Sequence, residues 1–266
     1  MNHLFIDGVA FWAPALPGWP VAGPALRGEP AAAPAAALPR RPAPQMLAAA
    51  ERRRAPDTVA LALEVAAAAV LGSGHDPAHL PSVFVSAHGD LGVNDYLCST
   101  LATSPALLSP TRFHNSVHNA ASGYWTMAAG CHQASTALSA FEWSFANGLL
   151  SAAVQCAADA RAVLLVGYDM AATGALASVT RSDGLLAVAL VLSPTRSAHS
   201  SARLDWALHD APATAPALQS AAARALAGNA MADALPLFES LARGAPGAML
   251  LPLSAHQALR LVLAAV

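Results

Sequence analysis

The sequence predicts a layered α/β domain, because short apolar strands alternate with helical segments along most of its length. Residues 162–167 and 185–192 are continuous apolar runs of strand length, and residues 82–86 have the same character. Segments with helical spacing separate these runs. This alternation is typical of a mostly parallel sheet with helices on both faces. A chain of 266 residues can bury one large core, so we expect a single domain over residues 1–266.

The first half of the chain contains the clearest elements. Residues 4–11 predict a first strand, and the Pro/Ala-rich stretch 12–46 predicts a surface excursion, because proline interrupts regular elements. Apolar residues at helical spacing between 44 and 70 predict one or two helices that end at Gly72. Further helices are expected at residues 92–102, 117–128 and 141–154.

The pattern is less regular in residues 200–266, which we expect to complete the sheet. Their expected elements are strands at 204–208 and 248–253, two Ala-rich helices between 215 and 243, and a last segment at 259–266.

Composition narrows the classes of partner and compartment. The chain is 55% hydrophobic and 11% charged, which predicts a sizeable apolar surface that is buried against something else. The net charge is −2 and the arginines are scattered apart from Arg52-Arg53-Arg54, which disfavours nucleic acid as a partner. Three distant cysteines indicate neither a disulfide framework nor a zinc site, and a reducing cytoplasm fits them. The N-terminus and the short apolar runs disfavour secretion and a membrane span.

Common catalytic motifs are absent from the sequence: it has no GxGxxG, P-loop, GxSxG or HExxH. His114 and His118 are four residues apart, a spacing that can bind a metal on one face of a helix. No third ligand is suggested nearby, and capping or interface histidines are the alternative. We therefore predict no metal and no cofactor.

Five segments occur in an order that resembles the β-ketoacyl synthases of the thiolase fold. They are SAHGDLG at 86–92, SPTRFHNSVHNAASG at 109–123, STALSA at 135–140, VLLVGYD at 163–169 and DGLL at 183–186. In that family a polar loop enters a helix, a strand ends in a Thr-Ala-Cys nucleophile turn, and a long helix and a further strand follow. The resemblance covers roughly residues 80–195, and more weakly 4–70. It implies a layered thiolase-like fold, truncated in its second half.

The catalytic residues of the family are missing from the matching positions. A ketosynthase needs a thiolate at a helix N-terminus, where backbone N–H groups lower the thiol pKa and hold the oxyanion. The matching residue is Leu138, or Ser139 if the register shifts by one. The family's two histidines come from its second half, in His-Gly-Thr and Asn-His-like motifs, and neither motif is present. The resemblance therefore implies no catalytic residue of this chain's own.

Two groups of residues are candidates for a partner interface or an acyl tunnel. The loop with Phe113, His114, Asn115, His118 and Asn119 matches one that reaches the partner's acyl pocket in the resembled family. Its alternative is a helix cap formed by Asn115 and Ser116. Trp125, Phe141 and Trp143 could line the tunnel or be core aromatics.

The function that the resemblance implies is that of a chain-length factor. Such a non-catalytic subunit would heterodimerise with an active β-ketoacyl-ACP synthase, meet acyl carrier protein and shape the acyl tunnel. The nearest system in the resemblance is aryl polyene biosynthesis, a type II polyketide or fatty-acid-like pathway. Two alternatives stay open: an independent acyltransferase or thiolase-like condensing enzyme using Cys131 or Ser139, and a scaffold or homodimer without an acyl substrate.

Overall fold

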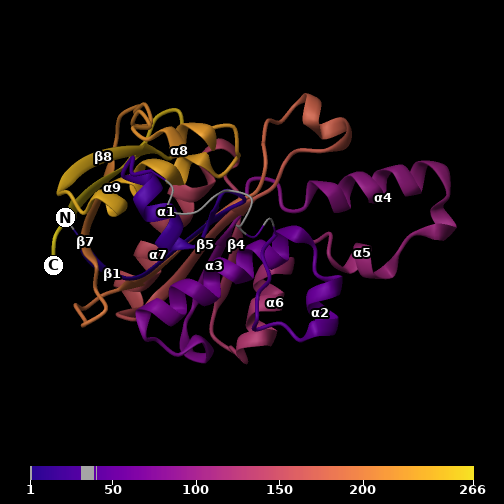
Figure 1. Cartoon of the computed structure of the whole chain (residues 1–266), viewed down its shortest axis with the longest axis horizontal. Helices are drawn as coiled ribbons and strands as arrows, with labels where there is room; N and C mark the ends of the chain where they lie inside the picture. Colours follow the sequence, from indigo (N-terminus) through magenta and orange to yellow (C-terminus); the bar gives the residue numbers. More distant parts are fainter. Residues whose placement is uncertain (1, 31–38, 40) are drawn as a thin grey trace.

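A computed structural model describes residues 2–30, 39 and 41–266. Its strands form one nine-stranded sheet in the order β4-β3-β5-β6-β1-β7-β9-β8, with β2 paired to β1. Helices lie on both faces of this sheet (Figure 1). The strands are β1 (Asn2–Ala13), β2 (Leu16–Pro17), β3 (Ser82–Val85), β4 (Ser135–Leu138), β5 (Val163–Asp169), β6 (Leu186–Ser193), β7 (Ala202–His209), β8 (Gly247–Pro252) and β9 (Ala258–Ala264).

Most helices follow the predicted periodic segments, with differences of a few residues at their ends, whereas α1 and α5 form where the sequence predicted no helix. They are α1 (Trp19–Leu26), α2 (Ala49–Arg54), α3 (Asp57–Ser73), α4 (Leu91–Thr103), α5 (Pro110–His114), α6 (Ala120–Ala129), α7 (Ser144–Asp159), α8 (Ala221–Ala225) and α9 (Leu235–Arg243). Short 3₁₀ turns lie between them: η2 (Pro77–His79), η3 (Pro105–Leu107), η4 (Phe141–Trp143), η5 (Gly174–Ser178) and η6 (Ala232–Ala234).

Two hydrophobic clusters hold the layers together, because successive side chains of a strand point to opposite faces. Val83 and Val85 pack into the cluster that contains residues of α1, α7, α8 and α9. Phe84 packs into the cluster of α3 and α6 on the other face. The predicted two-faced α/β architecture is confirmed.

The expectation of a mostly parallel sheet is wrong. Among the strands that the structure describes, only the pairs β3–β4 and β3–β5 are parallel. Strand β6 runs antiparallel to β5, and β1 runs antiparallel to both β6 and β7. Strands buried on both faces are continuously apolar in either direction, so the sequence pattern of these strands does not reveal how they pair.

The stretch 12–46 is not only a surface excursion. Its helix α1 packs against α9, where the rings of Trp19 and Phe238 lie 6.0 Å apart, and Leu26 is fully buried. Pro20 is tolerated because it lies in the first turn, where N–H groups lack helical partners. Residues 31–38 and 40, the centre of the predicted excursion, lie outside the described residues.

The C-terminal part completes the sheet as predicted. Strands β7, β9 and β8 extend it beyond β1, and α9 covers them with Leu235, Leu237 and Phe238 in the core. Among the described residues, no helix is both long and apolar enough to cross a membrane.

Candidate functional site

The candidate site lies where three parallel strands end. Because β3, β4 and β5 run in one direction, their carboxyl ends meet at the same edge of the sheet, where α/β proteins bind ligands. This edge carries the loop 86–90 after β3, the turn 139–143 after β4, and Asp169 at the end of β5. The chain then enters α7 from the turn, which is the strand-turn-helix arrangement of a nucleophile turn.

Phe141 occupies the bend of this turn. Its φ of 52° is in the left-handed region, which is unusual for an aromatic residue. Ser144, the first residue of α7, closes the turn: its Oγ accepts from Ala140 N at 3.0 Å and donates to Phe141 O at 2.8 Å. The Phe141 side chain is 53% exposed. The turn therefore presents an aromatic ring, not a nucleophile, at its bend.

The two residues that the sequence matched to the nucleophile lie before the bend. Leu138 is the last residue of β4 and packs against the core. Ser139 Oγ donates to Ala87 O at 2.8 Å, and the structure gives this hydroxyl no histidine partner. Sequence reasoning placed Phe141 among tunnel aromatics and missed its position at the bend, because no residue-type pattern signals a left-handed phenylalanine.

Asp169 connects the ends of β3 and β5. Its carboxylate accepts from Ser86 Oγ at 2.7 Å, from Ala87 N at 2.9 Å and from His88 N at 3.4 Å. Burial raises the pKa of Asp169 to about 6, although these three hydrogen bonds favour the charged form. This network sets the backbone of the 86–90 loop beneath the turn.

Two histidines lie at this edge, and both rings are engaged. His88 Nε2 bonds to Thr180 Oγ1, its ring meets the Phe141 ring edge-on at 5.5 Å, and burial lowers its pKa. His118 Nε2 lies 2.9 Å from Ser86 O, which assigns the ring proton to Nε2 because a carbonyl only accepts. With Glu142, Val179 and Arg181 from the flanking loops, His88 and Phe141 line a pocket of about 320 Å³.

The other predicted interface residues are spread over the loop between α5 and α6. Phe113, His114 and Asn119 are exposed, whereas Asn115 is buried. His114 is the last residue of α5 and His118 precedes α6, so the pair does not share one helix face. The described residues contain no group of three or more side chains placed to hold a metal ion.

The two predicted tunnel tryptophans differ in burial. Trp125 is buried in the α3–α6 cluster, which makes it a core residue. Trp143 is half-buried immediately before α7.

None of the cysteines lies at the turn. Cys131 precedes β4, and its buried Sγ contacts Leu80 O at 3.4 Å, so it lies at the amino ends of the parallel strands, opposite Asp169. Burial raises the pKa of the Cys156 thiol to about 12. Cys98 is exposed on α4. The geometry therefore does not support Cys131 as a displaced nucleophile of this turn.

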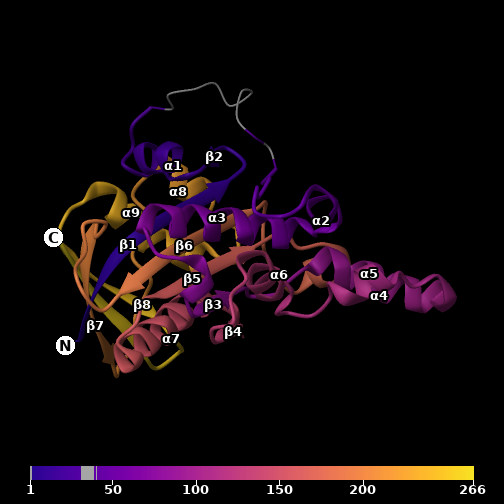
Figure 2. The same cartoon turned by 90° about the horizontal axis from the view of Figure 1, so that it is seen from below.

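Helices α4 and α5 form an arm that projects from the body of the molecule (Figures 1 and 2). Leu91 is the only buried residue of α4, and α5 buries none. The arm is held as a hairpin by Arg112, whose guanidinium lies 3.9 Å from the centre of the Tyr96 ring, and by Tyr96 Oη, which donates to Leu107 O at 3.3 Å. Its exposed apolar side chains, with one from the loop that follows, are Leu101, Leu107, Phe113 and Val117.

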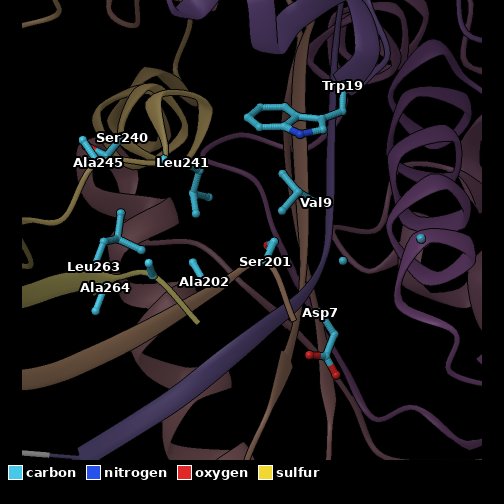
Figure 3. Close-up of a pocket in the computed structure, with 14 residues that line it drawn as sticks. Asp7, Val9, Trp19, Ser201, Ala202, Ser240, Leu241, Ala245, Leu263 and Ala264 are labelled. Carbon is cyan, nitrogen blue, oxygen red and sulfur yellow. The ribbon is translucent and has the colours of Figure 1, made fainter. Parts of the chain in front are cut away.

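A second pocket, of about 240 Å³, lies between α9, α1 and the β1–β7–β9 part of the sheet (Figure 3). The carboxylate and the two hydroxyl groups that line it already have partners. Asp7 binds Ser200 Oγ at 2.7 Å and His75 Nε2 at 3.1 Å, Ser201 Oγ donates to Ile6 O, and Ser240 Oγ donates to Pro236 O. The pocket therefore offers neither a free carboxylate nor a free hydroxyl group, and it is not our candidate site.

A family model, the β-ketoacyl synthase N-terminal domain, matches residues 28–248. The chain belongs to this β-ketoacyl synthase family. No curated protein sequence matches it.

Solved structures show the same ketosynthase fold. A chain of the ketosynthase in complex with its chain length factor from Xenorhabdus doucetiae matches with a TM-score of 0.74 and 23% identity, over 98% of this chain and 100% of that chain. The ishigamide ketosynthase/chain length factor matches with a TM-score of 0.71 and 14% identity over 100% of both chains. A chain of a type II polyketide synthase complex, in which an acyl-carrier protein is bound to its ketosynthase, matches with a TM-score of 0.73 and 10% identity. The match covers 100% of this chain and 99% of that chain.

Proposed function

We propose that this chain is a non-catalytic subunit of the chain-length-factor type. It heterodimerises with an active β-ketoacyl synthase and shapes the acyl tunnel that the pair shares. Carbon–carbon bond formation from units carried on acyl carrier protein takes place at the partner's cysteine. The biosynthetic setting is a type II polyketide or fatty-acid-like pathway in the cytoplasm, with aryl polyenes as the product class.

The observation that carries this proposal is Phe141 at the bend of the nucleophile turn. A phenyl ring cannot attack a thioester, and none of the three cysteines lies in the turn. We assign the family's nucleophile position to Phe141, because the residue at the bend is the one that faces the pocket at the N-terminus of α7. Leu138 is then the last residue of the strand that leads into the turn, and Ser139 is the first residue of the turn.

Two surfaces support pairing with another protein. Strand β4 is the edge of the sheet and pairs only with β3 in the described part of the chain, so its outer backbone groups can accept a further strand. The α4–α5 arm exposes Leu107 and Phe113, which would be buried if the arm lay against a partner.

The proposed contribution to the tunnel rests on aromatic side chains next to these surfaces. Phe141 and Trp143 lie at the turn, and Phe113 lies on the arm. Large rings at a dimer interface can close off space that an extending acyl chain would otherwise enter. Trp125 does not line the proposed tunnel, because its side chain is in the core.

Co-expression with a full-length β-ketoacyl synthase from the same genome tests the proposal. We expect a one-to-one complex by size-exclusion chromatography with light scattering. A radiolabelled acyl thioester should then label the partner and not this chain. Labelling of this chain, or recovery of the two proteins as separate species, would contradict the proposal.

A further inference from the structure

Asp233 caps the N-terminus of α7 from a distant part of the chain. It lies in η6, 87 residues after Ala146, and its Oδ2 accepts from Ala146 N at 3.2 Å. Trp143, the residue at the N-cap position of α7, has no side-chain acceptor to do this. The carboxylate therefore takes the position that an N-cap aspartate would normally hold, on the third residue of the helix.

The position of Asp233 has electrostatic consequences for the nucleophile turn. The N-terminus of a helix carries a partial positive charge, and α7 is 16 residues long. That charge is what would stabilise a thiolate at the bend of the turn. A carboxylate on the first-turn N–H groups offsets it. The second carboxylate oxygen, Oδ1, is buried and has no partner in the described structure. Burial raises the pKa of Asp233 to about 7, so its carboxylate carries the negative charge above about pH 7, where thiols titrate.

The other charged or titratable groups around the turn are few. Asp169 lies beneath it and adds a second buried carboxyl. Glu142 is the neighbour of Phe141 and is exposed, and Arg181 is an exposed cation on the far wall of the pocket. His88 contacts the Phe141 ring, and its lowered pKa keeps it neutral in the range where thiols titrate. Among the groups that the structure describes around the turn, three are therefore acidic, Asp233, Asp169 and Glu142, and Arg181 is a cation.

We propose that Asp233, in addition to Phe141, prevents this turn from supporting a reactive nucleophile. Its carboxylate lies at the N-terminus of α7 and cancels the positive potential that would stabilise a thiolate there. The inference rests on the proposed non-catalytic function and extends it to a named residue. It implies that restoring cysteine at position 141 does not by itself restore an activated thiol.

The experiment measures the pKa of a thiol placed at the bend. Phe141→Cys is made in a Cys98→Ser background, because Cys98 is the exposed one of the three native cysteines. The thiol pKa is read from the pH dependence of iodoacetamide alkylation, with the modified residue located by mass spectrometry. With Asp233 intact we expect a pKa at or above the ordinary value of about 8.5.

Asp233→Asn is then added, since asparagine keeps an acceptor for Ala146 N and removes only the charge. We expect the thiol pKa to fall by about one unit, because a nearby like charge opposes ionisation. The matched control is Asp159→Asn, which removes an exposed carboxylate at the other end of the same helix and should leave the thiol pKa unchanged.

Two results would overturn the inference. In the first, Asp233→Asn lowers the melting temperature but leaves the thiol pKa unchanged. This outcome is expected if Asp233 is only a structural cap. The other is a Phe141→Cys thiol with a pKa below about 7.5 while Asp233 is intact, well under the usual cysteine value. The second result is measured with Asp233 unchanged. Neither result depends on whether a partner synthase binds this chain.

Discussion

The Ser86 hydroxyl donates a 2.7 Å hydrogen bond to the Asp169 carboxylate, which joins the loop after β3 to the end of β5. The same Ser86 Oγ accepts from Gly89 N at 2.8 Å, so one hydroxyl connects a buried carboxylate to the turn of its own loop. Because His118 also contacts Ser86 O, the backbone around Ser86 links the pocket edge to the segment that leads into α6.

Stability should depend on pH through two carboxyl groups whose pKa is raised, those of Asp169 and Asp233. Burial raises the pKa of Asp169 to about 6 and that of Asp233 to about 7, both above the ordinary value near 4 of an unfolded chain. Between about pH 4 and 7 the folded protein therefore holds more protons than the unfolded one, and its stability falls as the pH rises. We expect the free energy of unfolding in urea to be lower at about pH 8 than at about pH 5, by on the order of a few kcal/mol.

Asp169→Asn should flatten this profile between pH 5 and 7, because the amide does not titrate, whereas the exposed Asp159→Asn should leave its slope unchanged. A stability that rises from pH 5 to 8 would contradict the assignment of these two groups.

The absence of a side chain at Gly8 allows α3 to pack closely against the sheet. A methyl group at this position would overlap the carbonyl oxygen of Ala69 in the backbone of α3, so the helix would have to move. We expect Gly8→Ala to lower the free energy of unfolding by about 3 kcal/mol. Gly123→Ala is the control, because an added methyl on α6 meets nothing within 4 Å, and it should raise stability by up to about 1 kcal/mol. Equal effects of the two changes in urea denaturation would refute this packing argument.

Ala160 ends α7 in a conformation that favours glycine. Its φ is 49°, in the left-handed region, and its backbone N–H caps Cys156 O. Ala160→Gly should therefore stabilise the protein by about 1 kcal/mol. Ala158→Gly, two residues earlier in the helix, should destabilise it by a similar amount of about 0.5–1 kcal/mol. Thermal denaturation of both variants checks the opposite signs.

Phe113 on the arm should contribute to partner binding. Its side chain is 62% exposed and would be desolvated in the proposed heterodimer, so Phe113→Asp should weaken the complex by roughly tenfold or more. Leu71→Asp on α3 is the control, since Leu71 is 85% exposed but lies outside the arm. Affinities measured by biolayer interferometry should separate the two. If Phe113→Asp leaves binding intact, or if Leu71→Asp weakens it equally, the interface does not lie on the arm.

Local patterns were enough to predict most of the elements and the family. The apolar run at 162–167 predicts β5, the periodicity before Gly72 predicts α3, and the ordered segments from 86 to 186 indicate the β-ketoacyl synthase family that the family model confirms. These features depend on residue type and on short-range spacing, and both can be read directly from a sequence. The absence of a cysteine near residue 140 was likewise visible without coordinates.

Other features depend on contacts between distant residues. The antiparallel pairing of β6 with β5 and with β1, the burial of α1 against α9, and the cap that Asp233 provides for α7 each join segments far apart in the chain. The left-handed φ of Phe141 is a backbone property that the closed turn imposes against the residue's own preference. The sequence by itself determined which chemistry the turn lacks. Only the tertiary structure decided which side chain occupies the bend and which charge lies against the helix behind it, because both depend on long-range packing.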